Sequence, residues 1–241
     1  MGAAPQLKYK RVLLKLSGES LAGDAGNGIA ASRLQYFMQE VKLLHKMGVQ
    51  LGIVIGAGNI FRGLTSYEVN VDRVTADQMG MLGTVINALA LRSVFEQNGI
   101  AATVFSAFNV GAIVEPYAPA RALEAMDQGK VVILGGGTGN PYFTTDTAGV
   151  LRAVELQMDV ILKGTRVDGV YNADPEKVED AIKFDELTYM EVVRRGLKVM
   201  DTTAITLAME NQLPIIVFNF NVSGNLHKII LGESVGTKVQ G

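Results

Sequence analysis

Short apolar runs alternate with longer amphipathic stretches along most of the chain. The runs are rich in leucine and β-branched residues and are bounded by turn residues, which predicts strands. They lie at Arg11 to Leu16, Gln50 to Ile55, Ala102 to Phe105, Val131 to Leu134, Asp159 to Lys163 and Ile215 to Phe218. Apolar residues at helical spacing predict helices at about 31–47, 73–98 and 145–157, and two short ones between the polar segment 172–180 and the last strand.

Strands that alternate with helices in this way are typical of a mostly parallel sheet covered by helices. We therefore expect an α/β fold, a three-layer sandwich with a central sheet. No stretch has the composition of a linker, and 241 residues with 48% hydrophobic content can bury one core. We expect a single domain, 1–241, with an amino-terminal lobe of about 1–155 and a carboxy-terminal lobe of about 156–241.

Composition and charge argue against several classes of function. The 22 lysines and arginines are balanced by 24 acidic residues and form no basic cluster along the chain, so we expect no nucleic-acid partner. The chain has no cysteine and two histidines, which argues against disulfides, thiol nucleophiles and metal centres built on these residues. No segment reaches the roughly 20 apolar residues of a spanning helix. We expect a cytoplasmic protein without a membrane partner.

Glycine, at 27 residues, is concentrated after predicted strands, where open α/β sheets bind their ligands. Three such turns are Lys15 to Gly18, Gly56 to Gly63 and Gly135 to Asp146. Their backbone N–H groups can approach an anion closely, and a neighbouring lysine or arginine can bind phosphate. The third is the most specific, because its glycines add little to a core and the helix start that follows favours an anion.

Two well-known phosphate motifs are absent from the sequence. No Gly-x-x-x-x-Gly-Lys-Ser/Thr occurs, which excludes a Walker A loop, and Phe61 stands where a dinucleotide fingerprint needs its third glycine. A fourth cluster, Lys163 to Pro175, carries aspartates and Tyr171, which could hold an adenine ring. Each turn alone also has a structural interpretation, for example as an Asp-Gly β-turn. Together they favour an enzyme that transfers a phosphoryl group from ATP to a small acceptor.

Six segments of the chain resemble the bacterial UMP kinases of the amino-acid-kinase fold, and the resemblance covers nearly the whole chain. They are Lys15 to Glu19, Gly58 to Gly63, Asp72 to Met81, Gly137 to Asp146, Val167 to Pro175 and Lys198 to Asp201. The resemblance implies transfer of the γ-phosphoryl group of MgATP to UMP, giving UDP and ADP in pyrimidine and CTP biosynthesis. It also implies a homohexamer, an amino-terminal lobe that mainly binds UMP, a carboxy-terminal lobe that mainly binds ATP, and Mg²⁺ held mainly through the ATP phosphates.

The same likeness assigns residues to each ligand. ATP would be bound by Lys15, Leu16, Ser17, Gly18, Gly58, Arg62, Thr165, Tyr171 and Asp174. UMP would be bound by Ala57, Asp77, Thr138, Gly139, Asn140, Pro141, Tyr142, Phe143, Thr144 and Thr145. The family binds its effector GTP at the loop Gly23, Asp24, Ala25, Gly26, Asn27 and Gly28, which implies activation by GTP, and UTP would inhibit by competing for the UMP site.

The implied reaction needs no general base. An acceptor phosphate has its second pKa near about 6 and is mostly dianionic at neutral pH, so catalysis becomes alignment and charge neutralisation. Lys15, Arg62 and Lys163 are the candidate cations, Asp146 would orient the lysines, and Asp77 would accept hydrogen bonds from the ribose hydroxyls. From the residues alone, Asp77 could equally be a surface helix residue, Asp146 a helix cap and Lys163 a strand-end lysine.

Three departures from the family pattern fall in these regions, of which the mildest is Gly164, which replaces a more usual alanine. Ala57 replaces a usual glycine, where a methyl group would crowd the UMP phosphate unless the backbone angles are ordinary, and Ala30 replaces a common aspartate near the GTP loop. Two other functions stay open. A carbamate or acetylglutamate kinase of the same fold would offer Asp77 no ribose, and a non-catalytic storage protein of this fold would bind ATP without turnover.

Overall fold

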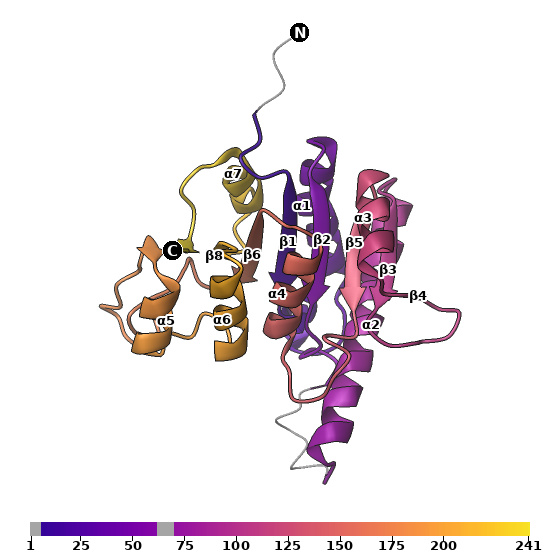
Figure 1. The fold of residues 1–241 in the computed structure, drawn as a ribbon, viewed down its shortest axis with the longest axis horizontal. Coiled ribbons are helices and arrows are strands. Elements are labelled where there is room, and N and C mark those ends of the chain that lie inside the picture. The colour runs from indigo at the N-terminus through magenta and orange to yellow at the C-terminus, as the bar shows by residue number, and fades with distance from the viewer. Residues whose placement is uncertain (1–5, 62–69) are drawn as a thin grey trace.

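One mostly parallel sheet forms the centre of the molecule (Figure 1). The computed structural model describes residues 6–61 and 70–241, and within them the sheet has nine strands in the order β4-β3-β5-β2-β1-β6-β8-β9-β7. The strands are β1 (Arg11–Leu16), β2 (Gln50–Ile55), β3 (Ala102–Ser106), β4 (Glu115–Pro116), β5 (Val131–Gly135), β6 (Val160–Thr165), β7 (Glu186–Leu187), β8 (Ile215–Asn219) and β9 (Thr237–Val239). Since β1, β2, β5, β6 and β8 run parallel, their carboxyl ends meet at one edge.

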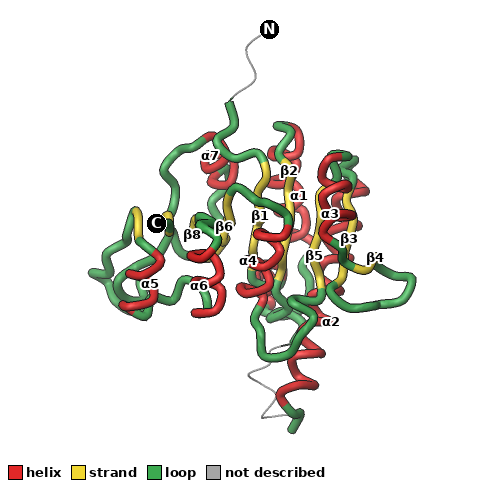
Figure 2. The backbone as a smooth tube through the Cα atoms, viewed as in Figure 1, coloured by secondary structure: helices red, strands yellow, loops and turns green. Residues whose placement is uncertain are grey.

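Helices cover both faces of the sheet (Figures 1 and 2). They are α1 (Ala31–Lys46), α2 (Arg73–Gln97), α3 (Pro119–Asp127), α4 (Thr145–Glu155), α5 (Tyr189–Arg195), α6 (Thr202–Glu210) and α7 (Asn225–Leu231), with 3-10 helices η1 (Gly18–Leu21) and η2 (Gly23–Ala25). Helices α1, α2 and α7 lie on one face, α3, α4 and α6 lie on the other, and α5 packs on α6. The start of α2 projects beyond the sheet at the lower edge in Figure 1.

Alternation along the strands divides the core into two clusters. The even-numbered residues of β1 pack toward α1 and α7, whereas Leu13 packs toward α4. Successive side chains of a strand point to opposite faces, so Lys15 shares the face of Leu13. Strand β6 repeats the arrangement with Ile161 and Lys163. The hydrophobic pattern therefore places two lysines beneath the start of α4.

Polar side chains define where several helices begin. Thr144 accepts hydrogen bonds from backbone N–H groups at the start of α4, and Asp72 accepts one from Thr75 at the start of α2. Ala30 occupies the same position before α1 and provides no side-chain acceptor. The alanine that departs from the family pattern therefore leaves this helix without a cap that is typically worth about 1 kcal/mol.

The predicted fold class is confirmed. The six predicted strands and the predicted helices are present, with ends that differ by at most two residues. Helices α3 and α7 and the short strands β4, β7 and β9 were not predicted, because two or three residues carry no measurable period and a helix of seven to nine residues carries little. The division into two lobes stays a prediction. No helix of the described chain is both long and apolar enough to cross a membrane.

Candidate active site

Two lysines lie side by side at the carboxyl ends of β1 and β6. Lys15 is paired with Lys163 in the register of these parallel strands. Both contact Asp146 of α4, because Lys15 Nζ pairs with Asp146 Oδ1 and Lys163 Nζ lies 2.8 Å from Oδ2. Lys163 Nζ also donates to the Val199 carbonyl. Gly149 of α4 leaves room for the lysine stem, since an added Cβ would lie 3.3 Å from Lys15 Cγ.

This cluster holds two positive charges against one negative charge in a nearly closed space. The exposed fractions of the side chains are 8% for Lys15, 15% for Asp146 and 16% for Lys163. Burial raises the pKa of Asp146, but the Lys15 and Lys163 ammonium groups outweigh it and hold that pKa below its ordinary value. Burial lowers the pKa of Lys163, with Asp146 opposing the shift and Lys15 adding to it. An excess buried cation is costly unless an anion joins it, so the cluster is suited to a phosphate.

Hydrogen bonds between α4 and α6 hold Asp146 in place. Asp201 caps α6 by accepting from Ala204 N at 3.0 Å. Its carboxylate also accepts hydrogen bonds from the hydroxyls of Thr144, at 2.5 Å, and Thr147, at 2.9 Å. The amino terminus of α4 is thereby fixed beside the lysines, and its partial positive charge favours an anion at the same place.

A pocket of about 140 Å³ lies between the first turns of α2 and the glycine-rich loop after β5. Its lining includes seven of the residues predicted to bind UMP, namely Ala57, Asp77, Thr138, Asn140, Phe143, Thr144 and Thr145. Gly139 lies in the same loop with φ +85°, and an added Cβ would come within 3.1 Å of the Ala107 carbonyl. Glycine is therefore required where this loop packs on the strand end of β3.

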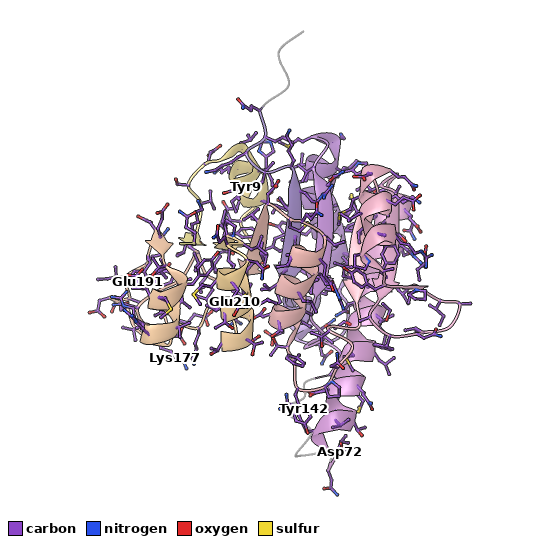
Figure 3. The ribbon with its side chains drawn as sticks, in the orientation of Figure 1. Tyr9, Asp72, Tyr142, Lys177, Glu191 and Glu210 are labelled. Carbon is purple, nitrogen blue, oxygen red and sulfur yellow. The ribbon has the colours of Figure 1, made fainter. Side chains whose placement is uncertain are left out.

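Asp77 points into this pocket and does not behave as an ordinary surface residue. Its side chain is 17% exposed and lies 2.8 Å from the Arg73 guanidinium. Its Oδ2 also accepts a hydrogen bond from Tyr142 N at 2.7 Å. Tyr142 has φ 71°, which is uncommon for a residue other than glycine, and its ring packs against Arg73. Figure 3 labels Tyr142 and Asp72 at the end of the molecule where α2 begins, and the contacts of Tyr142 with Asp77 and Arg73 close the loop onto the first turns of α2.

Six of the nine residues predicted to bind ATP line two cavities beside the lysines, and Gly18 and Gly58 line neither. A cavity of about 400 Å³ is lined by Thr165, Tyr171 and Asp174 together with the segment 195–199. A larger cavity of about 760 Å³ is lined by Lys15, Ser17, Lys163 and Thr165. Leu16 borders it as well, but its side chain is fully buried in the core, so only its backbone can face a ligand.

The loop predicted to bind GTP borders the larger cavity. Gly23, Asp24 and Gly26 are among its lining residues, beside Arg33. Arg33 donates to the Ser20 carbonyl at 2.7 Å and to Asn221 Oδ1 at 2.8 Å. Ala25 and Asn27 are exposed, and Gly28 donates its N–H to the Asn59 carbonyl. The loop thus lies between the larger cavity and the turn after β2.

The turns after β1 and β2 touch each other. An added Cβ at Gly18 would lie 2.4 Å from Asn59 Oδ1, 2.6 Å from the Gly56 carbonyl and 2.7 Å from Gly58 N, so only glycine allows this approach. Gly58 lies beside the side chain of Glu19. Two sets of backbone N–H groups are therefore brought to one place, next to Lys15.

The methyl group of Ala57 is accommodated by α2. Ala57 is absent from the described residues with positive φ, so its backbone angles are ordinary. A Cβ added at Gly83 of α2 would lie only 2.8 Å from the Ala57 Cβ, which shows that the missing side chain at position 83 leaves the space that the methyl group fills. The methyl group at position 57 is therefore accommodated by the absence of a side chain at Gly83.

The structure brings most of the predicted site residues to one edge of the sheet. Arg62 lies outside the described residues. Pro141 and Tyr142 belong to the glycine-rich loop after β5 but do not line the pocket of about 140 Å³. Three contributors were not predicted from the sequence, namely the Val199 carbonyl, the Thr147 hydroxyl and the Asp201 carboxylate, since an aspartate before a helical stretch looks like an ordinary cap. The assembled edge can hold two anionic ligands on either side of buried ammonium groups.

Comparisons with known proteins agree with this geometry. The model of the amino acid kinase family matches residues 10–219. The uridylate kinases of Bacteroides thetaiotaomicron and Parabacteroides distasonis are 55% and 56% identical over 232 residues, which are 96% of this chain and 98% of theirs. The crystal structure of UMP kinase from Bacillus anthracis has a TM-score of 0.94 at 43% identity over 96% of each chain, and that from Ureaplasma parvum has 0.91 at 32% over 97% of this chain and 100% of the other. The resemblance is confirmed, and the chain belongs to the amino acid kinase family, within the group of the uridylate kinases.

Proposed function

We propose that the protein transfers the γ-phosphoryl group of ATP to UMP, giving UDP and ADP. The observation that carries this proposal is the position of the Lys15, Asp146 and Lys163 cluster. The lysines border the cavity that adjoins the predicted adenine site, and Asp146 directly follows Thr144 and Thr145, which border the acceptor pocket. The names of the similar proteins supply the acceptor, since these are uridylate kinases.

In the proposed reaction, a phosphate oxygen of UMP attacks the γ-phosphorus of ATP while the bond to the β,γ-bridging oxygen breaks. No proton has to be removed, because the attacking phosphate is already dianionic at neutral pH. Two like charges about 4 Å apart repel by about 4 kcal/mol at an effective dielectric constant near 20. Lys15 and Lys163 offset this repulsion, Asp146 sets their positions, and the amino terminus of α4 adds its partial charge.

We expect Mg²⁺ to enter the site with ATP. The described residues include no group of three acidic or histidine side chains that could hold a metal ion, and the two oxygens of Asp146 face ammonium groups. These residues therefore fit a metal carried by the phosphates. When bound there, Mg²⁺ would neutralise charge on the phosphate oxygens.

Regulation and assembly follow from the family resemblance as further parts of this proposal. UTP carries the same uridine as UMP and would compete for the pocket beside Asp77. GTP activation would act at the loop 23–28, whose contact with Asn59 supports an influence on the transfer site. The resemblance implies a homohexamer, and an interface between copies is supported by an apolar stripe on α2, where Met79, Leu82 and Ile86 are 39%, 48% and 49% exposed.

An acceptor panel tests the proposal. ADP release from MgATP is measured with UMP, CMP, dUMP, carbamate and acetylglutamate, and background hydrolysis without acceptor is subtracted. We expect turnover with UMP to exceed that with any other acceptor, because the Asp77 carboxylate lines the pocket and can accept hydrogen bonds from a ribose, while Asp146, which follows Thr144 and Thr145, holds the lysines that would face the phosphate. Turnover with carbamate or acetylglutamate but not UMP would contradict the proposal. ATP binding without turnover on any acceptor would favour a storage protein.

The lowered pKa of Lys163 predicts an alkaline limit on activity. Lys163 must be protonated to offset phosphate charge, so kcat/KM for ATP should fall as pH rises through the pKa of the free enzyme. That pKa lies below the 10.5 of an ordinary lysine, chiefly because of burial. We expect Lys163→Arg to move the alkaline limb upward, since a guanidinium stays protonated. If kcat/KM for ATP falls at the same alkaline pH in both proteins, the pKa of Lys163 does not cause the decrease.

A further inference from the structure

Two asparagines form a buried pair behind the site. Asn87 of α2 is 0% exposed and Asn59 of the turn after β2 is 3% exposed. Neither side chain lines the acceptor pocket or the two nucleotide cavities. They have no part in the reaction proposed above, yet burying amide groups is unfavourable unless their hydrogen bonds are satisfied.

The pair is reciprocal, and every amide hydrogen in it has a partner. Asn87 Nδ2 donates to Asn59 Oδ1 and to the Gly56 carbonyl, both at 2.8 Å. Asn59 Nδ2 donates to Asn87 Oδ1 at 3.0 Å and to the Gly28 carbonyl at 2.7 Å. Gly28 N returns a hydrogen bond to the Asn59 carbonyl at 2.8 Å. One helix is thereby joined to the turn after β2 and to the loop 23–28.

Packing alone does not account for an asparagine at position 87. Asparagine is a poor helix former, and its neighbours on α2 that face the core, Val85, Ala88 and Leu91, are apolar. An aliphatic side chain would fill the same space without burying polar atoms. What Asn87 adds is direction, because its hydrogen bonds define the position of the Gly56 carbonyl and the Asn59 amide.

The groups held by Asn87 lie at the transfer site. Gly56 N donates to the Leu16 carbonyl at 2.9 Å, next to Lys15 in the chain. The Gly56 carbonyl and Asn59 Oδ1 are the atoms that an added Cβ at Gly18 would strike. A small movement of this turn would therefore displace the backbone N–H groups of the turns after β1 and β2, which lie beside Lys15.

We propose that Asn87 is a positioning residue for phosphoryl transfer, which acts by fixing the turn Gly56–Asn59 against Lys15 and Gly18. The proposal rests on the proposed function, because it assigns the turn to the phosphates of that reaction. The hydrogen bonds between Asn59 and Gly28 also connect the loop 23–28 to this turn.

Kinetics of Asn87→Leu provide the first test. Leucine keeps the branching and the number of heavy atoms of the side chain but removes its hydrogen bonds, so the turn is no longer tied to α2. We expect kcat to fall about 10- to 100-fold, as for misplacement of reacting groups by about 1 Å, and both KM values to change less than about threefold. Val94→Ala is the matched control, because Val94 lies two turns further along the same face of α2 and is 5% exposed. It should lower the melting temperature without lowering kcat.

Amide hydrogen exchange provides a second readout that does not depend on activity. In Asn87→Leu, exchange in the peptides covering 23–28 and 56–60 should accelerate, and in Val94→Ala it should not. If Asn87→Leu and Val94→Ala lose stability alike but both keep the wild-type kcat, or if exchange in the two peptides is unchanged, the positioning role is wrong. Failure of the proposed function is distinguishable, because the wild-type chain would then show no turnover with UMP while the exchange result could still appear.

Discussion

Replacing Lys15 with glutamine is expected to lower kcat about 100- to 1000-fold while the protein stays folded. Loss of one preorganised charged group at a reacting centre typically costs this much. Lys15 lies near the end of β1, is buried, and faces the start of α4 through Asp146. Glutamine is shorter than lysine but keeps the Cβ and Cγ that pack beneath Gly149, and it cannot offset the repulsion between two phosphates.

The stability of this variant follows from the charge count of the cluster. Removing Lys15 leaves Lys163 paired with Asp146 at 2.8 Å, which is a neutral pair. Because the Lys15 ammonium lowers the pKa of Lys163, its removal should also raise that pKa. Thermal unfolding should therefore show a melting temperature close to that of the wild type. Asp146→Asn would behave differently, because it leaves two buried cations without a counter-ion.

A surface lysine provides the comparison. Lys46→Gln removes the same charge from the exposed last turn of α1, and its steady-state kcat should match that of the wild type within about twofold. Both variants are assayed with saturating UMP and MgATP, and their folding is checked by circular dichroism. A Lys15→Gln protein with wild-type kcat would remove Lys15 from the reaction and would leave the proposed charge neutralisation without its central group.

The helices and strands that form this site were easier to predict from the sequence than the contacts between them. The apolar runs at 11–16 and 159–163 were enough to predict two strands, each with a lysine near its end, and the glycine turns marked the ligand edge. Strand order was not predictable in the same way, because the pairing of Lys15 with Lys163 arises from long-range contacts between β1 and β6. The same holds for Asp77 and Tyr142, whose hydrogen bond joins a helix to a loop 65 residues away.

Buried polar groups were the least visible from sequence. Asn87 falls in a helical stretch as an ordinary polar residue, and only its position in space shows that it meets Asn59. Asp201 likewise looks like a helix cap, which it is, and its second role toward Thr144 and Thr147 appears only when α4 and α6 are packed together. The pattern of apolar and polar residues along the chain indicates which residues are buried and which secondary structure they form. The hydrogen-bond partners of a buried side chain depend instead on how the helices and strands pack together.

Replacing Asp77 with asparagine is expected to raise KM for UMP about 10- to 100-fold and KM for ATP less than about threefold. A hydrogen bond to a charged group contributes about 1.5–3 kcal/mol, and each 1.36 kcal/mol corresponds to about a tenfold change. The asparagine oxygen can still accept from Tyr142 N, so the loop should stay closed, and the loss should fall on the ribose hydroxyls and on the pairing with Arg73. ATP is expected in a separate cavity lined by Tyr171 and Asp174.

The design separates acceptor recognition from helix capping on the same element. Asp72→Asn is the control, because Asp72 caps α2 through Thr75, lies outside the lining of the acceptor pocket, and is replaced by an equally good cap. Its KM for UMP should be that of the wild type.

With dUMP, the penalty of Asp77→Asn should shrink if the carboxylate accepts from the 2′-hydroxyl, since the bond is then missing in both proteins. Equal increases in KM for UMP and ATP would show that Asp77 does not recognise the acceptor. A penalty undiminished with dUMP, together with an unchanged KM for ATP, would assign the carboxylate to the 3′-hydroxyl instead.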